Sequence, residues 1–156
     1  MNILTTHVGS LPRPKEVSDL LFKRENNKEY DQKHFDDVIS NNVFEVVKKQ
    51  LDIGIDIISD GEMSKISYAT YVKDRYSGFA GDSERNPPQD LEKFPNYMKK
   101  IAASGGTPTY SRPCCVSEII PKDSNDLLND IDNLKNSSQK LNHKNIFMNS
   151  ASPGVI

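Results

Sequence analysis

Two carboxylates lie two residues apart in the run Asp60-Gly61-Glu62, directly after the apolar residues 55–58. A carboxylate held at the end of a buried strand can bind an ammonium group or act as a general base. For Glu62, such a role and simple capping of a following helix are both open. Asp60 fits the helix N-cap more readily.

The working residues of α/β folds lie at the carboxyl ends of the strands. In this chain the rule selects polar side chains after each of four predicted strands. A lone histidine at such a place is more often a hydrogen-bonded structural residue than a catalytic one, and a serine there can simply cap a turn. The residues selected are His7, Ser10, Arg13, Asp60, Glu62, Glu118, Asn149, Ser150 and Ser152.

Hydrophobic periodicity predicts the elements that must position these side chains. Apolar residues recur every three to five positions between Asp31, a plausible N-cap, and Gly54, a typical residue after a helix end. Further helices are predicted over residues 15–23 and 67–75 and after Asp123 or Ser124. Strands are predicted over residues 2–8, 55–58, 112–120 and 145–150.

Residues 76–110 are rich in glycine and proline and lack a clear period. A long irregular connection inside a compact domain is usually a lid or an excursion. We therefore predict an elaborated loop, with a hairpin at residues 78–81, inside a single domain that spans residues 1–156.

Composition excludes several classes of protein. The 156 residues include 20 basic and 22 acidic side chains, interspersed along the chain, so no basic face points to nucleic acid. No apolar run is long enough for a membrane helix, and the first residues do not resemble a signal peptide. The expectation is a cytoplasmic, soluble protein. The adjacent Cys114 and Cys115 and three scattered histidines do not make a metal site.

Four βα units form either a small open sheet or half of an eight-stranded barrel. The loop after the first predicted strand, residues 9–14, matches neither glycine-rich phosphate-binding pattern of open sheets. This favours the barrel.

Four segments of the chain resemble, in order, the catalytic barrel domain of the cobalamin-independent methionine synthase family and its single-domain relatives. They are residues 5–13 (TTHVGSLPR), 54–62 (GIDIISDGE), 71–79 (YVKDRYSGF) and 150–156 (SASPGVI). The resemblance implies an α/β fold of the type shared with uroporphyrinogen decarboxylase. It implies a partial (β/α)8 TIM barrel, with this chain as the N-terminal half and roughly its first four βα units.

The resemblance also implies an activity, that of a 5-methyltetrahydropteroyltriglutamate–homocysteine S-methyltransferase in methionine biosynthesis. In this family a methyl group passes from a methyltetrahydrofolate or another donor to the thiol of homocysteine or a related thiol, which a zinc ion activates. Carried over residue by residue, it assigns the amino-acid end of the thiol to Gly9, Ser10 and Glu62. His7 and Asp60 are further candidates for binding the substrate.

The zinc ligands of the family belong to the second half of the barrel and have no match in this chain, so no metal ligand is assigned. A half-barrel leaves strand edges open, which predicts a partner, either a second copy or a complementing C-terminal half. Two alternatives stay open. One is a non-catalytic half-barrel fragment or subunit, and the other is an alkyl transferase or decarboxylase on the same barrel.

Overall fold

The computed structural model describes residues 3–81, 89–103 and 113–152. Parts of four predicted segments lie outside these ranges: residues 2 and 112 of two strands, residues 82–88 and 104–110 of the long loop, and residues 153–156 of the last motif. The elements are α1 (Lys15–Glu25), α2 (Gln32–Asp52), α3 (Tyr68–Arg75), β1 (Phe79–Ala80), α4 (Gln89–Glu92), α5 (Pro95–Ala103), β2 (Cys114–Cys115) and α6 (Asn125–Lys140).

The long helix α2 begins and ends as its sequence predicts. The Asp31 carboxylate accepts a hydrogen bond of 2.9 Å from the backbone N–H of His34, which satisfies a donor at the open helix end. At the other end Gly54 adopts a φ of +87°, which lets the chain turn out of the helix. The residues that follow enter the interior at once.

Three extended segments run parallel through the structure and meet at isolated bridges. Thr6 pairs with Ile57, and Ile58 pairs with Ile146. The order is therefore the N-terminal segment, then residues 55–58, then the segment around Ile146. Ile58 is completely buried, as a central strand flanked on both sides requires. These bridges confirm the predicted parallel pairing of three of the four strands.

The prediction for residues 112–120 was wrong about the partner. Of the described residues 113–120, only Cys114–Cys115 form a strand, β2, and it pairs antiparallel with β1, with Phe79 opposite Cys115. Gly78 has a φ of +89°, and a Cβ atom there would lie 2.5 Å from the carbonyl oxygen of Glu118. A β-leaning sequence predicts an extended strand, but it does not specify which strand lies beside it. The described residues thus hold three parallel segments rather than four.

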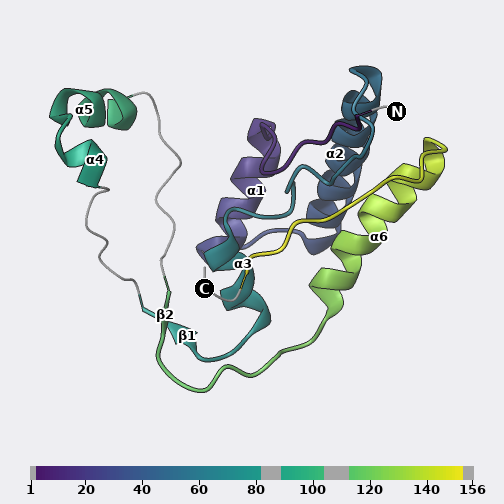
Figure 1. Cartoon of the computed structure of the whole chain (residues 1–156). Helices are drawn as coiled ribbons and strands as arrows, with labels where there is room; N and C mark the ends of the chain where they lie inside the picture. The colour runs from purple at the N-terminus through teal and green to yellow at the C-terminus, as the bar shows by residue number, and fades with distance from the viewer. Residues whose placement is uncertain (1–2, 82–88, 104–112, 153–156) are drawn as a thin grey trace.

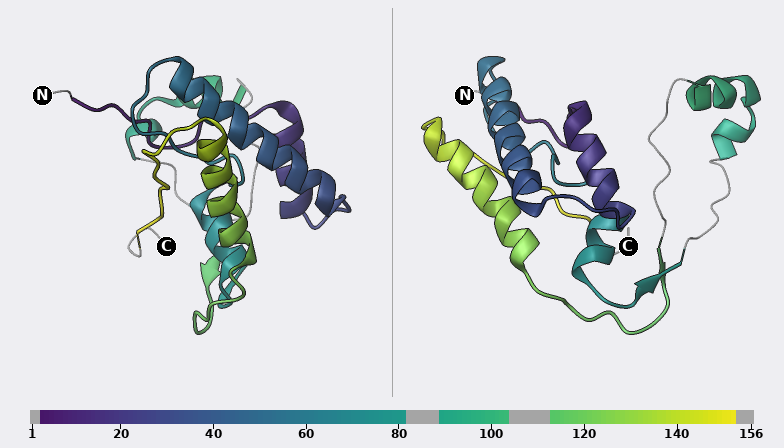
Figure 2. Two further views of the ribbon diagram at one scale, coloured as in Figure 1. Left: turned by 90° about the vertical axis from the view of Figure 1, so that its right-hand side faces the viewer. Right: turned by 180° about the vertical axis from the view of Figure 1, so that it is seen from behind.

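The prediction of an irregular loop over residues 76–110 was also wrong in part, because two helices, α4 and α5, lie within it. Figures 1 and 2 show these two helices packed against each other and standing apart from α1, α2 and α6. Phe94 and Tyr97 in this region are 60% and 55% exposed. The β1–β2 pair joins these helices to the rest of the molecule.

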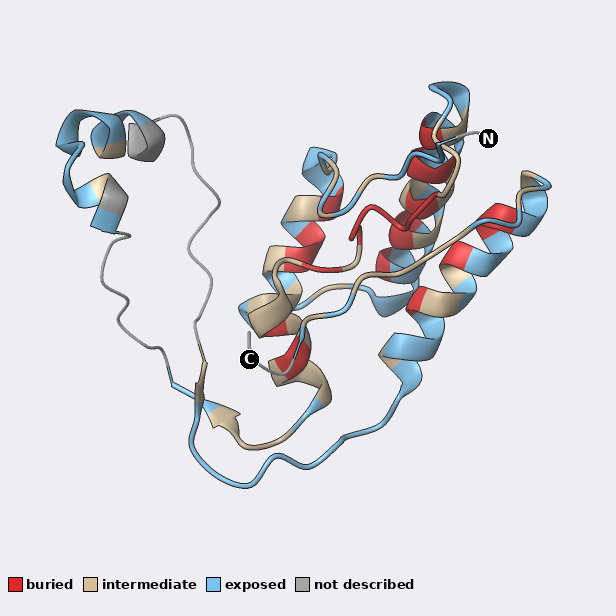
Figure 3. Ribbon diagram, viewed as in Figure 1, coloured by how far each residue is buried: buried red, intermediate tan, exposed pale blue. Residues whose placement is uncertain are grey.

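The hydrophobic core lies where α2 packs against α1 on one side and α6 on the other, with residues 55–63 between them (Figure 3). None of the described helices is long and apolar enough to cross a membrane. The core side chains share low exposure and come mainly from one face of each helix: Val17, Leu20, Leu21, Phe35, Val38, Ile39, Val43, Val46, Val47, Ile58, Met63 and Leu134.

Candidate functional site

The site is built on the turn that follows the central parallel segment. Gln50 of α2, a buried side chain, accepts a hydrogen bond of 3.1 Å from the backbone N–H of Ser59 and donates one of 2.8 Å to its carbonyl oxygen. The backbone N–H of Leu11 donates to the carbonyl oxygen of Gly61 over 3.0 Å. A helix and the first loop therefore fix the backbone on either side of Asp60.

Glu62 lies at the centre of the site, and its side chain receives three hydrogen bonds. The Ser10 hydroxyl donates to Oε2 over 2.5 Å, while the Tyr68 hydroxyl and the Asn149 amide donate to Oε1 over 2.7 and 2.6 Å. These donors come from three different parts of the chain. The structure thus brings the predicted site residues Ser10 and Glu62 into direct contact, and Glu62 is only 7% exposed.

Arg13 holds the backbone of the same turn. Its guanidinium donates two hydrogen bonds to the carbonyl oxygen of Glu62, at 3.2 Å from Nε and 2.9 Å from Nη2. Nη2 also donates to the carbonyl oxygen of Lys65. An arginine that binds two carbonyl oxygens in this way fixes the conformation of the turn rather than facing solvent.

Asp60 is buried within the turn. Its Oδ1 accepts a hydrogen bond of 3.0 Å from the backbone N–H of Glu62, and its Oδ2 lies 3.2 Å from the ammonium of Lys65. Neither Asp60 nor Glu62 caps the following helix, because the N-cap of α3 is Ser67, which forms a capping box with Thr70. The capping interpretation of both carboxylates is therefore wrong.

The surroundings favour the ionised form of Glu62. Burial opposes ionisation, but hydrogen bonds from Ser10 and Tyr68 and the positive charges of Lys65 and Arg13 outweigh it and hold the pKa of Glu62 below its usual value. Burial and the hydrogen bond to this carboxylate raise the pKa of Tyr68. A neutral tyrosine hydroxyl therefore faces an anionic glutamate.

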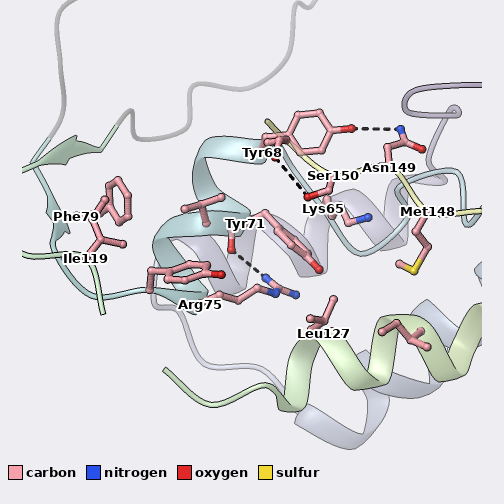
Figure 4. A pocket seen from close by; sticks show the side chains of 14 residues that line it. Lys65, Tyr68, Tyr71, Arg75, Phe79, Ile119, Leu127, Met148, Asn149 and Ser150 are labelled. Carbon is pink, nitrogen blue, oxygen red and sulfur yellow. Dashed lines mark hydrogen bonds between the residues drawn. The ribbon is translucent and has the colours of Figure 1, made fainter. Parts of the chain in front are cut away.

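A pocket of about 580 Å³ adjoins Glu62 and is bounded by α3, α6 and residues 148–151 (Figure 4). Tyr68 and Asn149 line it and also contact Glu62, so these two side chains form the wall between the pocket and the carboxylate. Beside the pocket, the guanidinium of Arg75 lies 3.2 Å from the Tyr71 ring centre, and both groups bind Asp130. Most of the lining is apolar, including Val72, Phe79, Ile119, Leu127, Ile131 and Met148.

The other candidates from the sequence differ in their surroundings. His7 is partly exposed, and its Nε2 atom is buried without a hydrogen-bond partner. Gly9 directly precedes Ser10 and has a φ of +105°, a backbone conformation that favours glycine. Glu118 and Ser150 are exposed.

The described residues hold no group of three or more His, Cys, Asp or Glu side chains that fits a metal ion. Cys114 and Cys115 lie on β2, and their sulfur atoms are free thiols. The residues that the structure describes therefore do not fit the zinc site that the family implies.

Tyr68 and Lys65 were not predicted as site residues, whereas Asn149 was predicted from its place at the end of a strand. Tyr68 reaches Glu62 only because α3 turns back over the strand end. A helix start six residues after a candidate carboxylate is the one local signal that could have selected it. Lys65 is a buried lysine, a rarity that hydrophobic patterning alone does not detect.

Parallel segments that meet beside a long helix, with a buried carboxylate at their ends, define an α/β protein with a candidate site at the strand ends. Residues 3–86 match the family described as "Cobalamin-independent synthase, Catalytic domain", and the chain belongs to this family. Over 75 residues, or 48% of this chain, it is 32% identical to a methionine synthase of Sulfolobus acidocaldarius. The aligned region spans 22% of that relative.

Proposed function

We propose that the chain is part of a methyltransferase of the methionine synthase type, in which Glu62 and Ser10 bind the amino-acid end of a thiol substrate. The observation that carries this proposal is the contact between Ser10 and Glu62, two residues 52 positions apart, at the ends of neighbouring parallel segments. Both lie within the region that matches the family. The three parallel segments would be neighbouring strands of a (β/α)8 barrel.

The hydrogen bonds of Glu62 fit this role. The carboxylate accepts three bonds from neutral donors, and a substrate ammonium offers three charged N–H donors in their place. When the ammonium binds Glu62, the hydroxyl of Ser10 becomes free to donate to the substrate carboxylate. Both ends of an amino acid are then recognised by groups of opposite polarity.

We propose homocysteine as the thiol and a methyltetrahydrofolate as the methyl donor. Zinc, which would activate the thiol in a complete enzyme, has no fitting ligand set among the described residues, so this chain's part is to bind and orient the amino-acid end. A second copy of the chain or a complementing half of the barrel is the proposed partner. The cytoplasm is the proposed location.

Calorimetric titration of the full chain with L-homocysteine tests the proposal. Glu62→Gln should weaken binding by roughly 10- to 100-fold, because a charged hydrogen bond is replaced by a neutral one. Glu45→Gln on the exposed side of α2 removes the same charge outside the hydrogen-bonded group around Glu62 and serves as the control. Equal affinity of the wild-type chain and Glu62→Gln would refute the assignment.

The pocket beside Glu62 favours a second candidate, an alkyl transferase that acts on a larger thiol. Its apolar lining suits a ligand body larger than the short side chain of homocysteine. In that case an amino-acid thiol with an added apolar group should bind more tightly than homocysteine in the same titration. Equal or weaker binding of the larger ligand rejects this candidate.

A further inference from the structure

We propose that Asp60 and Lys65 are positioning residues for Glu62: their buried ion pair fixes the turn that presents Glu62 and balances the charge beside it. This inference rests on the proposed role of Glu62 as the carboxylate that binds the ligand. It adds two residues that do not touch the ligand themselves.

The geometry ties the ion pair to Glu62 directly. The side chains of Lys65 and Asp60 are only 2% and 3% exposed, and the ammonium lies 3.2 Å from Oδ2. The other oxygen of the same carboxylate, Oδ1, accepts the backbone N–H of Glu62 over 3.0 Å. One buried carboxylate therefore connects the lysine to the backbone of the binding residue.

The backbone of Glu62 needs this support. Its φ is +56°, a left-handed conformation that strains the backbone of residues other than glycine. Asp60 holds the N–H of Glu62, and Arg13 holds its carbonyl oxygen. With both backbone groups held, the side chain points at Ser10, Tyr68 and Asn149 rather than at solvent.

The charges explain why a lysine is buried here. Two ionised carboxylates two residues apart in the chain repel each other. The titratable groups around Glu62 are Asp60, Lys65, Arg13 and Tyr68. Lys65 cancels the negative charge of Asp60, so that Glu62 can stay ionised in a partly dry site. Burying an ion pair brings little net stability, which points to a role in the site.

The test is to measure the pKa of Glu62 in the ligand-free full chain by carbon-13 NMR of its carboxyl group, assigned with Glu62→Gln. Lys65→Met removes the positive charge and should raise the titration midpoint by about one pH unit. Asp60→Asn removes the negative charge and should lower the midpoint. The double variant Asp60→Asn/Lys65→Met should return it close to the wild-type value.

The opposite signs distinguish charge balance from damage to the fold, because a loosened turn would move both single variants in one direction. Lys48→Met is the matched control, since it breaks an exposed lysine–aspartate pair on α2 with the same change of charge. If Lys65→Met does not fold, the double variant should still titrate at a higher pH than Asp60→Asn, because it lacks the lysine charge. Shifts of the same sign, or no shift beyond that of Lys48→Met, would overturn the proposal.

Homocysteine affinity separates this inference from the proposed function. Lys65→Met should bind homocysteine about twofold more weakly than Lys65→Arg near pH 5, because less of Glu62 is ionised there. If Glu62→Gln binds like the wild type, the proposed function fails, whatever the NMR result. If Glu62→Gln loses binding while Lys65→Met and Lys65→Arg bind equally well, only the present inference fails.

Discussion

The turn at residues 60–65 and the segment that carries β1 and β2 lie in very different surroundings. The turn is held by Gln50, Leu11 and Arg13, and every residue from 58 to 63 is buried. β1 and β2 are two residues each, and Val116 beside them is 62% exposed. One region has its backbone fixed by buried side chains from several directions, whereas the other is held by backbone contacts between residues 75–80 and 114–122.

This difference shows where the chain can support precise binding. A site needs side chains whose supporting contacts are themselves buried and hydrogen-bonded, and the turn meets that requirement. The β1–β2 segment contributes Phe79 to the edge of the pocket, but it has few buried contacts of its own. Segments of this kind open at low free energy.

The largest expected loss of stability comes from a substitution in the hydrophobic core, in the segment directly before the turn. Ile58→Ala removes a completely buried side chain from the central parallel segment and should lower the free energy of unfolding by about 2–5 kcal/mol. Val116→Ala on the exposed segment should leave it almost unchanged. Urea unfolding followed by circular dichroism measures both variants, and similar losses would contradict the contrast.

Alanine substitutions at two glycines should cause a smaller loss of stability, which is again larger in the turn than near β1. Gly61 has a φ of +61°, and a Cβ atom there would lie 3.2 Å from side-chain carbons of Leu11 and Val46. Gly61→Ala should therefore cost about 2–3 kcal/mol through both strain and crowding. Gly81 near β1 has a φ of +75° but open space around it, so Gly81→Ala should cost only about 1 kcal/mol from its backbone conformation. Thermal unfolding of the two variants would show the difference, and equal melting temperatures would refute it.

The smallest effect is the dependence of stability on pH that Glu62 contributes. Its pKa is lowered in the folded chain, so it stabilises the fold above its unfolded pKa of about 4.3, and this stabilisation is lost as the pH falls through the folded value. Glu62→Gln should therefore flatten the decline of the free energy of unfolding on the acid side. Urea unfolding at a series of pH values measures this slope, and an unchanged slope would mean that Glu62 is not held as described.

The sequence predicts helices far better than it predicts pairing. The cap Asp31 and the apolar spacing identify α2 correctly, because these signals are local in the sequence, and the helix predicted over residues 67–75 corresponds to α3. The partner of residues 112–120 was predicted wrongly, because pairing depends on contacts that no local pattern encodes. The helices α4 and α5 were missed because glycine and proline dominate the composition around them.

The candidate site also shows that local sequence patterns do not predict contacts between distant parts of the chain. Glu62 and Ser10 were predicted from their places after strands and from the resemblance to the family, and the structure places them in contact. Lys65 and Tyr68 were missed, because their contacts with Asp60 and Glu62 form only once the chain turns back into α3. The family resemblance named the ligand-binding side chains but not the groups that hold them.

The most direct test of the central claim is a nitrogen-15 NMR titration of the full chain with L-homocysteine. If Glu62 binds the ammonium, the side-chain amide of Asn149, which donates to Glu62 over 2.6 Å, should shift together with the backbone amides of Ser10 and Glu62. The amides of Phe79 and Val116 should stay unchanged. Shifts confined to the β1–β2 segment, or no shift at Asn149 while homocysteine binds, would contradict the assignment of this turn as the ligand site.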